Sequence, residues 1–179
     1  VNTLGVVNRG LTQSGNGLAS GFLNLSTNRK LITLVGINAV EGTPDVGTSS
    51  TANFPIYARV VGKIGANGIA DTKTTLFNGY SGNNIRSAVT VDGSAFWTTG
   101  NVGNEGVVYV NNANISGFNT LSTTNTRSIG IFNNQLYVSS GTNGLGLSKV
   151  GTGLPTSGTQ TLTNLNGFLT TGGDPYSFA

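Results

Sequence analysis

Few side chains in this sequence are suited to catalysis. There is no histidine and no cysteine, which removes the usual general base, thiol nucleophiles and the common zinc ligands. Six carboxylates remain: Glu41, Asp45, Asp71, Asp92, Glu105 and Asp174. A glycosidase needs two carboxylates about 5 to 10 Å apart, and the one pair close in sequence, Glu41 and Asp45, falls in a loop. We therefore expect no enzymatic site, no organic cofactor and no transition metal, because only oxygen ligands suited to calcium or magnesium are left.

Two arginines and two aromatic residues are the candidates for ligand binding, because they lie in repeated segments. Arg86 and Arg127 hold equivalent positions in the repeat, while Trp97 and Tyr137 are offset by one position. An arginine near the start of a strand can tie carbonyls or a carboxylate of the adjacent unit, or line a face that recognises an acidic sugar. The aromatic residues can form a platform for a sugar or fill the core between units. Both interpretations stay open for all four residues.

The repeat itself is the strongest signal in the sequence. Residues 85–100 align without gaps to residues 126–141, an offset of 41 positions (126 minus 85). Both copies predict two strands joined by a tight turn, at Asp92-Gly93 and at Asn133-Asn134, since these residue types tolerate the positive φ that short hairpins need. We expect the two hairpins to superimpose. Residues 22–36 form a weaker third copy.

Two further strand patterns follow each copy, so each unit has four strands. These patterns cover residues 57–64 and 69–76, 106–110 and 115–121, and 145–150 and 159–165. A period near 40 residues with four strands per unit is typical of a propeller blade, and no helical periodicity extends over ten residues. The sequence predicts an all-β fold, a single β-propeller region over residues 1–179, with blades at 20–76, 85–121 and 126–166 and a partial blade from 174.

Other all-β architectures remain as alternatives. A β-helix would have a much shorter repeat, and a sandwich lectin would lack an ungapped internal repeat. A closed propeller typically has four to eight blades, and three would leave two apolar blade faces exposed. We therefore expect this region to be a portion of a larger propeller, completed either by the remainder of a parent chain or by self-association.

Composition narrows the possible partners and location. Charged residues make up 8% of the chain and the net charge is +3, without a basic cluster, which argues against nucleic acid as a partner. No apolar run approaches the roughly 20 residues of a membrane span. The chain starts at Val1 without a signal peptide, as expected of a mature, processed or excerpted chain. Asn24 and Asn114 match the N-glycosylation pattern, and the surface of hydroxyls and amides suggests a secreted or extracellular protein.

Several segments resemble known propeller sequences. The run LNLSTNRKLITLVG at residues 23–36 is similar to the blade entry of many propellers. The runs SGNNIRSAVTVDGSAFW at 81–97, GTGLPT at 151–156 and DPYSF at 174–178 resemble uncharacterised secreted bacterial proteins thought to be β-propellers. This resemblance covers most of residues 20–179. It implies a propeller fold and export, and it carries over no catalytic residues.

These observations favour a non-enzymatic function. We expect an extracellular or surface-associated module that binds a glycan, matrix or another copy of itself, or that builds a structure. A lectin-like carbohydrate-binding protein is the first alternative. Part of a hydrolase or lyase propeller, with its catalytic residues outside this stretch, is the second.

Overall fold

The computed structural model describes residues 5–15, 17, 19–101, 105–142, 145–168 and 173–178. Over these residues the regular structure consists of β-strands, and two short 3-10 helices, η1 (Val46–Thr48) and η2 (Thr51–Asn53), are the only helical elements. In this described part of the chain, twelve strands form three antiparallel sheets of four strands each. The predictions of an all-β fold and of three four-stranded units are therefore confirmed.

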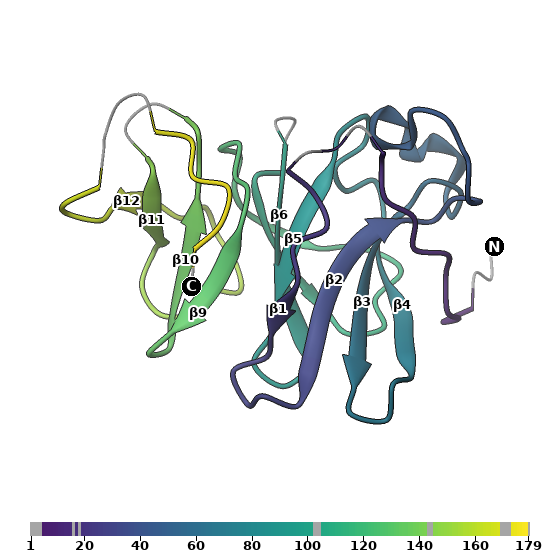
Figure 1. Cartoon of the computed structure of the whole chain (residues 1–179), viewed down its shortest axis with the longest axis horizontal. Helices are drawn as coiled ribbons and strands as arrows, with labels where there is room; N and C mark the ends of the chain where they lie inside the picture. The colour runs from purple at the N-terminus through teal and green to yellow at the C-terminus, as the bar shows by residue number, and fades with distance from the viewer. Residues whose placement is uncertain are drawn as a thin grey trace.

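Each sheet is a meander in which consecutive strands are neighbours (Figure 1). Sheet 1 contains β1 (Asn24–Leu25), β2 (Leu31–Ile37), β3 (Arg59–Gly65) and β4 (Ala70–Leu76). Sheet 2 contains β5 (Ile85–Val89), β6 (Ala95–Gly100), β7 (Val107–Asn111) and β8 (Asn119–Ser122). Sheet 3 contains β9 (Ile129–Phe132), β10 (Gln135–Ser139), β11 (Leu147–Val150) and β12 (Leu162–Asn164). Both predicted hairpins of the repeat are present, as β5–β6 and β9–β10.

The two hairpins differ in their turns. Asn133 and Asn134 alone connect β9 to β10, with φ angles of 48° and 57°, so the predicted two-residue turn is correct. The connection from β5 to β6 is longer, at five residues, 90–94. Gly93 has a φ of 88° there, and Asp92 accepts hydrogen bonds from the backbone N and the hydroxyl of Ser94 at 2.9 and 2.6 Å. The expected two-residue turn at Asp92-Gly93 is therefore wrong.

The longer turn shifts the strand register by one residue. Trp97 pairs with Val89, whereas Val138, its counterpart in the gapless alignment, pairs with Ile129. Ile129 aligns with Ala88 and not with Val89. A register shift between Ile85 and Ser87 follows in β5, as a β-bulge would produce. The gapless sequence alignment matches Trp97 with Val138, but these two side chains consequently lie on different faces of their sheets.

The three sheets stack face to face around two apolar clusters. The cluster between sheets 1 and 2 contains nine buried residues: Val35, Val61, Leu76, Tyr80, Ile85, Ala88, Phe96, Val108 and Val110. The cluster between sheets 2 and 3 contains eight: Val89, Trp97, Val107, Leu121, Ile129, Leu136, Val138 and Val150. Alternate residues of each strand point to opposite faces, so sheet 2 is covered on both sides. Sheets 1 and 3 are the two ends of the stack.

Hydroxyl and amide side chains also join neighbouring sheets near their first strands. Asn24 Nδ2 and Thr33 Oγ1 of sheet 1 donate to the carbonyl oxygen of Ala88 in β5, at 2.8 and 2.7 Å. In the same way Thr99 Oγ1 of sheet 2 donates to the carbonyl oxygen of Arg127, just before β9, at 2.6 Å. The first strand of sheet 2, β5, lies between β1 and β9, the first strands of the two neighbouring sheets (Figure 1).

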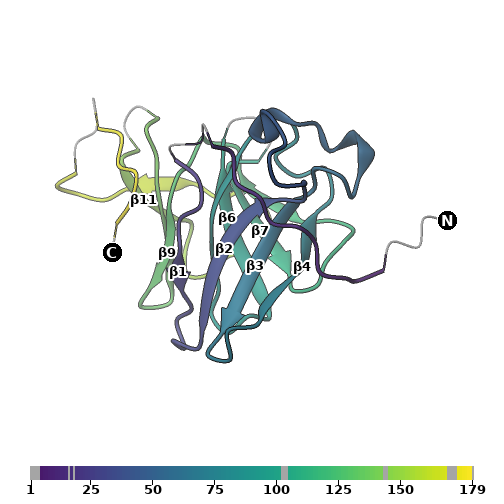
Figure 2. The same ribbon diagram turned by 45° about the vertical axis from the view of Figure 1, so that its right-hand side comes forward.

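The N-terminal segment covers part of the outer face of sheet 1 (Figure 2). Arg9 N donates to Thr72 Oγ1 of β4 at 3.0 Å, and Thr12 forms a β-bridge with Ile37 of β2. Leu11 lies over two glycines, where an added Cβ would come within 2.6 Å of its side chain at Gly36 and 2.9 Å at Gly62. The absence of side chains at these glycines lets the segment pack directly on the sheet.

Candidate functional site

Arg86 lies in β5 and is bonded to the start of sheet 3. Its exposed fraction is 7%, and its Nη1 donates to the carbonyl oxygen of Thr126 at 2.8 Å and to Asn125 Oδ1 at 2.6 Å. Burial, and secondarily the positive charge of Arg127, lower its pKa to about 10. These contacts are those of an arginine that ties one sheet to the next.

Arg127 makes the corresponding connection from sheet 3 to the C-terminal segment 173–178. Its Nε and Nη2 donate to the two carboxylate oxygens of Asp174, the latter at 2.7 Å. The guanidinium also lies over the ring of Tyr176, with its carbon 4.6 Å from the ring centre. Such a two-point contact with a carboxylate suits the planar fork of arginine. Both arginines are engaged within the chain, and a ligand-binding role for them stays a prediction.

Each of the two arginines contacts the segment that follows its own sheet. Arg86 bonds to Asn125, which lies two residues before Arg127, and Arg127 bonds to Asp174, which lies two residues before Tyr176. Residues 173–178 therefore approach sheet 3 as the start of sheet 3 approaches sheet 2. Phe178, at the end of this segment, packs on Phe132 of β9 with ring centres 6.1 Å apart.

Trp97 and Tyr137 occupy the same face of successive sheets, although the gapless alignment offsets them. Each points away from the preceding sheet. Trp97 is 5% exposed in the cluster between sheets 2 and 3, and its Nε1 donates to the carbonyl oxygen of Pro155 at 2.6 Å. Tyr137 is half-buried and lines an open hollow. Trp97 fills core, whereas the sugar-platform interpretation stays a prediction for Tyr137.

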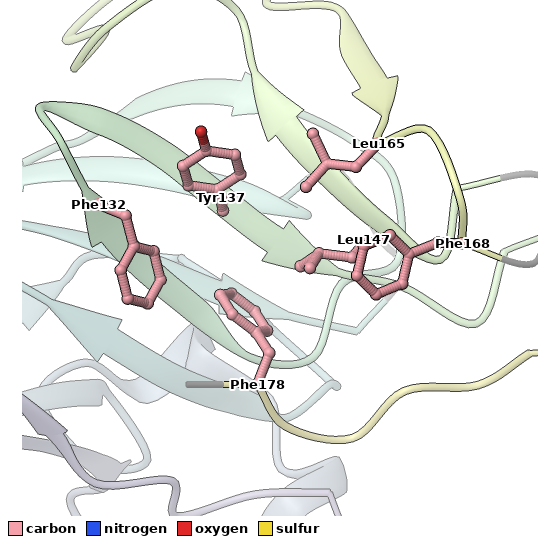
Figure 3. A pocket seen from close by; sticks show the side chains of 6 residues that line it. All are labelled: Phe132, Tyr137, Leu147, Leu165, Phe168 and Phe178. Atoms are coloured by element: carbon pink, nitrogen blue, oxygen red, sulfur yellow. The ribbon is translucent and has the colours of Figure 1, made fainter.

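This hollow lies on the outer side of sheet 3 and measures about 400 Å³. Figure 3 shows six apolar or aromatic side chains gathered around it, which we call the bare face: Phe132, Tyr137, Leu147, Leu165, Phe168 and Phe178. None of them is charged. Phe132 and Phe168 are 45% and 49% exposed. The bare face of sheet 3 thus exposes apolar side chains to solvent, whereas sheet 3 buries the apolar side chains on the equivalent face of sheet 2.

No family model matches the chain, and neither does any curated protein or solved structure.

A second hollow, of about 620 Å³, lies between two turns that are about 100 residues apart in sequence. We call it the turn hollow. The β1–β2 turn contributes Leu25, Ser26, Thr27 and Arg29, and the β9–β10 hairpin contributes Ile131, Phe132, Asn133 and Asn134. The sequence predicts turns and strand ends for these residues. Their convergence was not predicted, because it depends on how sheets 1 and 3 flank β5.

The carboxylates do not gather into a site within the described part of the chain. Glu41 and Asp45 are both exposed in the loop after β2. Among the described residues no group of three His, Cys, Asp or Glu side chains is placed to hold a metal ion. Glu105 Oε2 accepts a hydrogen bond from the backbone N of Tyr80 at 3.1 Å, and Asp174 pairs with Arg127.

The described residues also include no helix long and apolar enough to cross a membrane.

Sequence reasoning missed one buried charge. Arg59, at the start of β3, is fully buried. Its guanidinium donates to the carbonyl oxygens of Gly47, Ser49, Tyr57 and Asn83 at distances from 2.5 to 3.3 Å. Burial lowers its pKa to about 10, with a smaller opposing effect from the charge of Glu105. Arg59 thereby fixes the long loop between β2 and β3 against the chain that leads into β5.

Proposed function

We propose that this chain is a non-enzymatic structural module of β-propeller type, extracellular or surface-associated, that works by packing its bare face against another sheet. The observation that carries the proposal is the contrast between two equivalent faces. On sheet 2, Trp97 and its neighbours are buried by sheet 3. On sheet 3, Tyr137 and its neighbours line an open hollow. Contiguous apolar surface of this kind typically marks an interaction site.

The partner that we propose for the bare face is a second copy of the chain. The N-terminal segment lies across the outer face of sheet 1, through Arg9, Leu11 and Thr12. A head-to-tail stack would have to displace that segment. Two bare faces can instead meet about a twofold axis, in which the same patch serves both partners and the assembly closes. The six side chains of the bare face are uncharged. Lys149 is exposed beside Tyr137 on the same side of sheet 3, so such a pair must leave the two Lys149 side chains in solvent.

Composition supports an extracellular location for the module. Gly, Ser, Thr and Asn supply about half of the chain, and charged residues only 8%, against roughly 25% in typical soluble domains. Inter-sheet hydrogen bonds use these neutral groups, as at Thr33 and Thr99. A surface of hydroxyls and amides suits assembly through many modest hydrogen bonds.

Sedimentation velocity over a range of protein concentrations tests the proposal. We expect the 179-residue chain to form a dimer. Leu147→Asp places a charge in the bare face and should weaken dimerisation by at least about 30-fold, as expected for a central interface residue. Ile69→Asp is the matched control, because Ile69 is a 68% exposed apolar residue just before β4. It should leave the dimer unchanged.

Thermal unfolding of both variants separates loss of pairing from loss of folding. A folded wild-type chain that stays monomeric at every concentration would refute self-association through the bare face. Equal effects of Leu147→Asp and Ile69→Asp would refute the location of the interface.

A further inference from the structure

The turn hollow combines the groups that recognise a sugar bearing a carboxylate. Arg29 is exposed at a φ of 59° and supplies a guanidinium fork, which matches the two oxygens of a carboxylate. Asn133 and Asn134 are exposed on the opposite side of the hollow from Arg29. Their side-chain amides both donate and accept hydrogen bonds. Phe132 also borders the hollow, but its ring packs on Tyr137 and Phe178 of the bare face.

The β1–β2 turn that carries Arg29 is held firmly in place. Ser26 Oγ accepts hydrogen bonds from the backbone N of Lys30 and of Leu31 at 3.2 and 3.0 Å. The backbone N of Thr27 donates to the carbonyl oxygen of Thr90 in the β5–β6 connection at 3.2 Å. A turn fixed to its own sheet and to its neighbour loses little conformational entropy when a ligand binds, which favours affinity.

The charge around the turn hollow favours an acidic ligand. Its lining contains Arg29 and no carboxylate, and Lys30 is exposed next to Arg29. A nucleic acid is less well matched, because phosphate backbones are bound by several cations spread along a surface. One guanidinium among amides and hydroxyls suits a short chain of hydroxylated sugar rings that carries a carboxylate.

We propose that the turn hollow is a binding site for an acidic oligosaccharide of the uronic acid class. The carboxylate lies on Arg29, and ring hydroxyls lie on Asn133 and Asn134. The site is separate from the proposed dimer interface except at Phe132, which borders both hollows.

Isothermal titration calorimetry with an α-1,4-linked galacturonic acid trimer tests this site. Wild-type protein is expected to bind the trimer, and to bind the corresponding neutral galactose trimer at least tenfold more weakly. Arg29→Gln should weaken binding of the acidic trimer at least tenfold, and Asn134→Gly severalfold. Glycine at position 134 removes the side-chain amide while accepting the φ of 57°. Lys73→Gln, in β4 and outside the lining, removes the same charge as Arg29→Gln and should change affinity less than twofold.

Two results would overturn the proposal. One is a folded wild-type chain that shows no heat of binding at millimolar trimer. The other is an Arg29→Gln variant that binds as tightly as the wild type. Arg29 and Asn134 lie outside the bare face, so sedimentation of the same variants reports on the dimer separately. A failure of the sugar site is thereby distinguishable from a failure of the proposed self-association.

Discussion

Replacing Arg59 with methionine is expected to lower the free energy of unfolding by about 3 kcal/mol or more. The substitution keeps much of the apolar stem but removes the guanidinium donors to the carbonyl oxygens of Gly47, Ser49, Tyr57 and Asn83. Ser49 keeps the hydrogen bond from the backbone N of Gly82. A buried polar group that loses its partner costs about 1 to 3 kcal/mol. Four carbonyls are affected, and local rearrangement lets water reach some of them, so the total falls below the sum.

Urea unfolding of matched variants measures this effect. Arg29→Met changes the same residue types at an exposed turn position and should alter stability by less than about 0.5 kcal/mol. Arg59→Lys keeps the charge but provides one ammonium in place of a fork, so its loss of stability should be intermediate. A decrease below about 1 kcal/mol for Arg59→Met would contradict the structural role assigned to Arg59.

Truncating two neighbouring residues of β10 is expected to affect two different properties, the stability of the monomer and the affinity of the dimer. Leu136 faces sheet 2 and is fully buried, whereas Tyr137 faces the hollow on the other side of the strand. Leu136→Ala should destabilise the monomer by about 2 to 5 kcal/mol, the range for buried leucines. Tyr137→Ala should cost the monomer less than about 1 kcal/mol, while weakening dimerisation at least about tenfold.

The comparison requires urea unfolding at concentrations below dimerisation, together with sedimentation velocity. Because the two residues are adjacent, differences in local strand propensity are small. Equal destabilisation of the monomer by the two variants would show that both faces of sheet 3 are covered. That result would contradict the stack in which sheet 3 is an uncovered end.

Much of the fold could be predicted because its signals are local. Strand alternation, and turn residues such as Asn133 and Asn134, identified three units of four strands. The register of β5–β6 could not be predicted, because a five-residue connection and a two-residue turn look alike in a gapless alignment. The gapless alignment consequently pairs Trp97 with Val138, which lies on the other face of its sheet. In the structure, the residue of sheet 3 on the same face as Trp97 is Tyr137.

The candidate sites were less predictable, because they depend on contacts between distant segments. The carbonyl partners of Arg59 are present in any sequence, so nothing marked that residue in advance. Arg86 and Arg127 were identified from the repeat, and the structure gives their partners within the chain. The turn hollow joins Arg29 to Asn134 across two sheets, a proximity that no local pattern encodes.

Hydroxyl-radical footprinting tests most directly whether the bare face is an interface. The oxidation rates of Phe168 and Phe77 are compared at protein concentrations below and above dimerisation. Both side chains are comparably exposed, at 49% and 42%, but Phe77 lies just after β4 of sheet 1, at the other end of the stack. Oxidation of Phe168 is expected to fall severalfold at high concentration, while that of Phe77 stays constant. Equal rates for Phe168 at both concentrations, or equal protection of Phe168 and Phe77, would contradict packing through the bare face.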